Sequence, residues 1–92
     1  MNEPTPAPEA SFLTMLYTMG TQAMIALGEL PSPVTRQQNF DPRHAKWQME
    51  TLEILEKKTA GNLTDEEATA LSNVLKDVRE KWAARQADLE DE

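Results

Sequence analysis

Apolar side chains along most of the chain recur every three to four residues, which is typical of amphipathic α-helices. No stretch alternates apolar and polar residues for long enough to predict a β-strand. Proline, glycine and capping residues divide this pattern into three helical segments, predicted at about 12–27, 42–59 and 65–86. The sequence therefore predicts an all-α fold of three helices.

The first predicted helix is apolar around most of its circumference. No charged residue lies between Ala10 and Gly28. Ser11 is a good N-cap, because its hydroxyl can accept a hydrogen bond from a free N–H group of the first turn. Gly28 stands where a helix C-terminus favours a residue with positive φ. A helix with so few polar side chains must be covered by protein on most sides.

A short, capped turn joins the second and third predicted helices. Asp41 precedes a proline and is the predicted N-cap of the second helix, and Gly61 is its predicted C-cap. Thr64 and Glu67 have the spacing of a capping box, in which each side chain accepts from the other residue's backbone N–H. A turn this short joins antiparallel neighbours, so these helices are expected to form an αα-hairpin.

The 92 residues are enough for one domain, predicted at 11–86. Residues 1–10 contain three prolines and two glutamates and are expected to form a disordered leader. Residues 87–92 are expected to form an acidic tail. The start of the chain lacks the basic region of a secretory signal, and the chain has no cysteine. Both observations favour the cytoplasm.

Few residues in the sequence are candidates for catalysis or metal binding. The only histidine, His44, has no partners at the spacing of a metal site, and no serine lies in a nucleophile elbow. The sequence therefore predicts no catalytic residue, no metal and no cofactor. The net charge of −7 opposes binding to nucleic acid, because the phosphate backbone is also negative.

Membrane association through the first helix is an alternative, since its uncharged stretch approaches the length that a bilayer requires. The nearest charged residues, Glu9 and Glu29, have the wrong sign for a cytoplasmic boundary. Threonines and a glutamine also interrupt the apolar run. Membrane insertion is therefore disfavoured.

Self-association is the favoured way to cover the first helix, because the hairpin can cover only one side of it. A symmetric homodimer built on paired first helices meets this need. The residues predicted to form the contact are Phe12, Leu13, Leu16, Met19, Gly20, Ala23, Met24 and Leu27. Three alternatives stay open: an unidentified protein partner, cover by the long connection and Trp47 within one chain, or a small-ligand pocket near His44 and Trp47.

Two motifs give the chain a family resemblance. One is Leu27-Gly28-Glu29 followed by Pro31 and Pro33, and the other is Lys58-Thr59-Ala60-Gly61-Asn62-Leu63-Thr64 followed by Glu67. Together they resemble a small, uncharacterised bacterial family of helical proteins, a domain of unknown function. The resemblance implies a cytoplasmic bacterial protein and supplies no catalytic residue. The sequence departs from the family at Met49-Glu50, where members often carry an apolar residue followed by aspartate.

Overall fold

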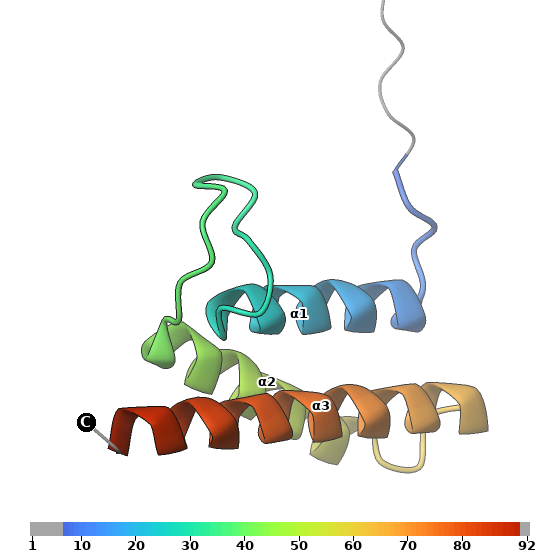
Figure 1. Cartoon of the computed structure of the whole chain (residues 1–92). Coiled ribbons are helices and arrows are strands. Elements are labelled where there is room, and N and C mark those ends of the chain that lie inside the picture. Colours follow the sequence, from blue (N-terminus) through green and yellow to red (C-terminus); the bar gives the residue numbers. More distant parts are fainter. Residues whose placement is uncertain (1–6, 91–92) are drawn as a thin grey trace, which may run out of the picture.

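The computed structural model describes residues 7–90, and its regular elements are three helices (Figure 1). Helix α1 spans Phe12–Ala26, α2 spans Pro42–Thr59 and α3 spans Asp65–Glu90. The described part contains no strand, which confirms the predicted all-α fold of three helices. Residues 7–10 of the predicted leader have no regular structure, and residues 1–6 lie outside the described part.

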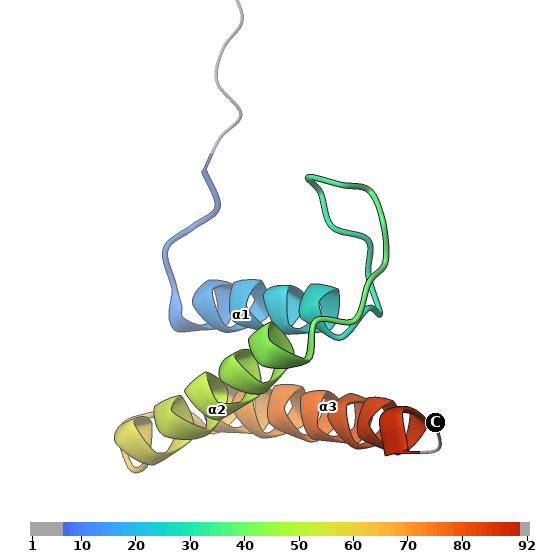
Figure 2. The same ribbon diagram turned by 90° about the vertical axis from the view of Figure 1, so that its left-hand side faces the viewer.

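Each helix packs against the other two. Helices α1 and α3 lie alongside each other and run in the same direction, while α2 runs back obliquely against both (Figures 1 and 2). Helices α2 and α3 therefore form the predicted hairpin, and α1 packs on it. The core that they share is made of Leu16, Ala23, Ala26, Leu27, Ala45, Leu52, Leu71, Leu75 and Val78.

Local hydrogen bonds cap both ends of α1. The Ser11 Oγ accepts from the Thr14 backbone N–H at 3.0 Å, as an N-cap does. Gly28 has a φ of +79°. Its N–H donates to the Ile25 carbonyl, and the N–H of Glu29 donates to the Met24 carbonyl. These two bonds form a Schellman motif, so α1 ends one residue earlier than predicted and residue 27 serves as its C-cap.

The turn between α2 and α3 differs in detail from a simple glycine cap. Ala60 has φ −53° and ψ 127°, Gly61 has φ +84°, and the Asn62 N–H donates to the Thr59 carbonyl at 2.9 Å. This geometry is a type II turn, which favours glycine at its third position. The capping box that follows is formed as predicted, with Glu67 N–H to Thr64 Oγ1 at 3.1 Å and Thr64 N–H to Glu67 Oε1 at 2.9 Å.

Helix α3 continues to Glu90, four residues past its predicted end. The predicted tail of residues 87–92 is thus helical as far as it is described, and residues 91–92 lie outside the described part. The physical reason is composition: alanine, glutamine, leucine and glutamate are good helix formers, and neither glycine nor proline interrupts them. Acidic residues at the end of a helix oppose its dipole, but not strongly enough to end it here.

Candidate interaction surface

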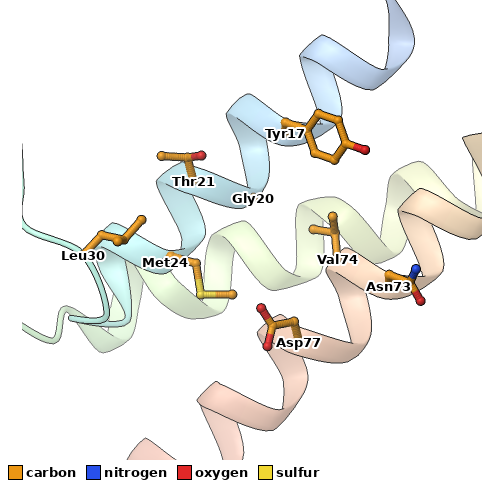
Figure 3. Close-up of a pocket in the computed structure, with 8 residues that line it drawn as sticks. All are labelled: Tyr17, Gly20, Thr21, Met24, Leu30, Asn73, Val74 and Asp77. Carbon is orange, nitrogen blue, oxygen red and sulfur yellow. The ribbon is translucent and has the colours of Figure 1, made fainter.

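An open groove of about 360 Å³ lies between α1 and α3 (Figure 3). It is lined by Tyr17, Gly20, Thr21, Met24, Leu30, Asn73, Val74 and Asp77. We refer to it as the α1–α3 groove. Its walls are mostly apolar, and Asp77 is the only charged residue among them. A concave apolar surface with a few polar groups at its edge is the usual form of a binding site.

Gly20 allows α1 to approach α3 closely at the middle of this groove. A Cβ added at position 20 would lie 3.2 Å from Cγ1 of Val74, which is tighter than ordinary packing. The sequence predicted a close approach of helices at Gly20, but between two copies of the chain. In the structure the close neighbour of Gly20 is Val74 on α3 of the same chain, and a contact between two copies at this residue stays a prediction.

Four of the eight residues predicted at the partner contact are used inside the chain. Leu16, Ala23 and Leu27 are fully buried in the core, and Gly20 is buried against Val74. Leu16, Ala23 and Leu27 have no surface left for a partner, and Gly20 keeps only the edge that lines the α1–α3 groove. The contact prediction is therefore narrowed to the other four residues, which are half-buried: Phe12, Leu13, Met19 and Met24.

The structure also exposes apolar residues outside the predicted contact. Tyr17 is 56% exposed and lines the α1–α3 groove, and Leu30 lines the same groove from the start of the connection. A helical signal for Tyr17 was present, since it precedes Gly20 by three residues and Met24 by seven. No local signal marked Leu30, because its position depends on how the connection folds back.

The connection between α1 and α2 is a structured loop that stands away from the helices (Figures 1 and 2). At its base the Asp41 N–H donates to the Ala26 carbonyl at 2.7 Å. The Gln38 side-chain amide also donates to the carbonyls of Gly28 and Glu29. These bonds join the two ends of the loop.

Helix α3 holds the same loop from the side. The Arg85 guanidinium lies 2.6 Å from the Glu29 carboxylate, and the Lys81 Nζ lies 4.0 Å from it. The rings of Phe40 and Trp82 pack edge to face with centroids 6.1 Å apart. The part of α3 from Lys81 to Arg85 therefore has a structural role, because it holds the loop in place.

A second, more polar pocket of about 330 Å³ lies between α1, the loop and the start of α2. It is lined by Gln22, Ile25, Ala26, Ser32, Thr35, Gln37, Asn39, Asp41, His44 and Gln48. His44 Nδ1 lies 2.7 Å from the Asp41 carboxylate, and the His44 backbone N–H donates to the same carboxylate at 3.2 Å. These hydrogen bonds, the side-chain one first, lower the pKa of Asp41 below its ordinary 3.8. His44 thus has a structural partner at the N-cap.

Trp47 does not cover α1 as the single-chain alternative proposed. Its side chain is 59% exposed on the outer side of α2, as is that of Ile54. The inner side of α1 is covered instead by α2 and α3. Within residues 7–90, no helix combines the length and apolar character needed to cross a membrane.

A comparison with known protein families identifies the family of this chain. The family model for a domain of unknown function, DUF1844, matches residues 9–84. The chain belongs to this family. The predicted resemblance to a small, uncharacterised family is thereby confirmed. No curated protein and no solved structure matches the DUF1844 chain.

In this DUF1844 member, the residues that carried the resemblance lie at the ends of helices. Leu27 is in the core, Gly28 turns the chain, and Glu29 binds Arg85. Gly61 and Thr64 form the turn and cap between α2 and α3. Each of these residues has a structural task in the fold.

Proposed function

We propose that this DUF1844 chain is a non-catalytic protein-interaction module of the bacterial cytoplasm that associates with a second copy of itself, most simply as a homodimer. The observation that carries the proposal is the uncovered side of α1. No charged residue occurs along this helix, yet Met15 and Tyr17 are exposed and Met24 borders an open apolar groove. Apolar surface of this kind is stabilised when another protein covers it.

Charge indicates which face a second copy would approach. A chain with a net charge of −7 repels its own copies wherever acidic surfaces meet. The side of α1 is the part of the surface where this repulsion is weakest, because the helix itself carries no charge. Two copies can therefore approach each other most easily through this side.

The sole histidine fits a non-catalytic role. His44 is held against the Asp41 carboxylate at the start of α2, and both side chains are more than half exposed. An exposed pair at a helix N-cap stabilises the helix end and lacks the enclosed, water-excluding surroundings in which side chains become strong acids or bases.

The proposal predicts a specific effect of Tyr17→Glu. A carboxylate on the uncovered side of α1 would be desolvated in the dimer, so the dissociation constant should rise by about tenfold or more. Sedimentation velocity over a concentration series measures this change. Ile54→Glu is the matched control, since it adds the same charge to α2 at a site of similar exposure, 59% against 56%. Equal effects of the two variants would contradict the proposed surface.

One observation favours a second candidate function, a small-ligand binder. The polar pocket beside His44 contains Gln48, which is only 8% exposed and whose amide donates to Gln22 Oε1 at 3.3 Å. Buried amides with spare hydrogen-bonding capacity can orient a neutral polar ligand. A saturable, ligand-induced rise in melting temperature that is lost in Gln48→Leu would move the proposal to this pocket.

A further inference from the structure

We propose that the occupant of the α1–α3 groove is the tip of the α1–α2 connection, residues 33–36, of a second copy. In this contact Val34 lies against the apolar wall of the groove and Arg36 lies beside Asp77. The inference rests on the self-association proposed above and specifies which surfaces meet. We refer to residues 33–36 as the loop tip.

The loop tip is exposed but well ordered by its own hydrogen bonds. Of the large apolar side chains in the described part, Val34 is the most exposed, at 89%. The Ser32 N–H donates to the Gln37 carbonyl at 2.9 Å, and the Arg36 N–H donates to the Ser32 carbonyl at 2.7 Å. The Ser32 hydroxyl accepts from the Val34 N–H at 3.2 Å. A segment already held in one conformation loses little entropy on binding.

The groove offers the loop tip a matching surface. In Figure 3, Met24 and Val74 lie on facing helices, and Tyr17 and Leu30 lie at either end of the α1 side. Gly20 lines the groove between them, and the Val74 side chain packs close to it. A volume of about 360 Å³ accommodates a small apolar group such as Val34 with an adjacent proline.

Charge complementarity sets the register of the two surfaces. Arg36 is the only charged residue between Leu30 and Phe40, and Asp77 is the only charged residue lining the groove. Neither forms an ion pair with another residue of the part that the structure describes. Between two chains that each carry −7, this is a contact of opposite signs, which favours the correct orientation and opposes others.

The loop tip that fills the groove must come from a different copy. A valine that is 89% exposed does not occupy the groove of its own chain. In a two-fold dimer each copy would give one loop tip and receive one, so the contact would form twice. This reciprocity makes the arrangement testable with charge reversals in a single gene.

The first experiment is a charge swap in the full chain, measured by sedimentation equilibrium. Arg36→Glu and Asp77→Arg should each weaken self-association by about tenfold or more, because each places like charges together. The double variant R36E/D77R should restore the association to within about threefold of the wild-type chain. Controls of the same charge change outside the two surfaces are Arg43→Glu on α2 and Glu80→Arg on α3, both exposed. Far-ultraviolet circular dichroism checks that each variant is helical.

The second experiment uses the absence of cysteine from the chain. Val34→Cys and Asn73→Cys chains of different tag length are mixed and oxidised. The mixed disulfide should form faster than either homodimeric one, because the loop tip of one copy lies at the Asn73 edge of the other's groove. This measurement also serves if a charge variant fails to fold.

The outcomes separate the inference from the proposed function. A wild-type chain that stays monomeric overturns both. A wild-type dimer that is unaffected by the charge reversals, or is not restored by the double variant, and shows no preferred Val34–Asn73 disulfide overturns the inference alone. That result would assign the groove to a different occupant. Loss in both single variants and recovery in the double variant supports the loop tip.

Discussion

Asp41 has three separate roles in this fold. It closes the loop through its backbone N–H, caps α2 through its carboxylate and binds the ring of His44. The last two contacts lower its pKa below 3.8, so the folded chain favours the ionised form more than the unfolded chain does. This stabilisation is present above the ordinary pKa and is lost as the pH falls through the lowered one.

The expected result is a pH-dependent effect of Asp41→Asn. Asparagine can still cap the helix, but it cannot titrate. The melting temperature of this variant should lie below that of the wild-type chain at about pH 7, and the gap should close as the pH falls toward about 2. His44→Ala removes the ring hydrogen bond. In that background, the difference in melting temperature between chains with Asp41 and with Asp41→Asn should be smaller at neutral pH. A gap that is the same at every pH would refute this role of the carboxylate.

The residues that end helices were predictable because their partners lie within three or four positions in the sequence. The Ser11 cap and the Thr64–Glu67 box form as local chemistry requires. The Gly61 turn was placed correctly, but its type was not, because the angles of the residue before it decide between a cap and a type II turn.

At the scale of elements, the order of the three helices followed from the apolar spacing, and the antiparallel direction of α2 and α3 followed from the short second turn. The neighbours of α1 could not be read in the same way. A glycine in an apolar helix permits close packing but does not say which helix approaches, and here it is α3 of the same chain. The length of α3 was also underestimated, because the acidic segment 87–90 was expected to fray, although its helix propensity is enough to continue the helix to Glu90.

Gly20 gives a test of the packing between α1 and α3. Gly20→Leu should destabilise the chain by about 1–3 kcal/mol, since the larger side chain must displace Val74. Gly20→Ala should have a smaller effect, because the strain of its Cβ is offset by a gain in helix propensity of about 1 kcal/mol. Urea unfolding at one fixed protein concentration measures both values. A neutral Gly20→Leu variant would show that α1 does not pack on α3 here.

At the scale of the whole molecule, three helices form one shared core and still leave part of α1 uncovered. The need for cover was predictable from the uncharged stretch alone. The surface left for a partner was not, because half of the predicted contact residues are buried by α2 and α3. The groove and the loop tip arise from the way the connection and α3 meet the end of α1, which no local pattern encodes.

The most direct test of this account is the mass of the unmodified chain in solution. Light scattering coupled to size exclusion, over a roughly hundredfold range of concentration, reports it without any substitution. A homodimer formed through α1 should give a particle of twice the 10.4 kDa chain mass at high concentration, and this particle should dissociate on dilution. A particle of 10.4 kDa at every concentration would contradict self-association through α1.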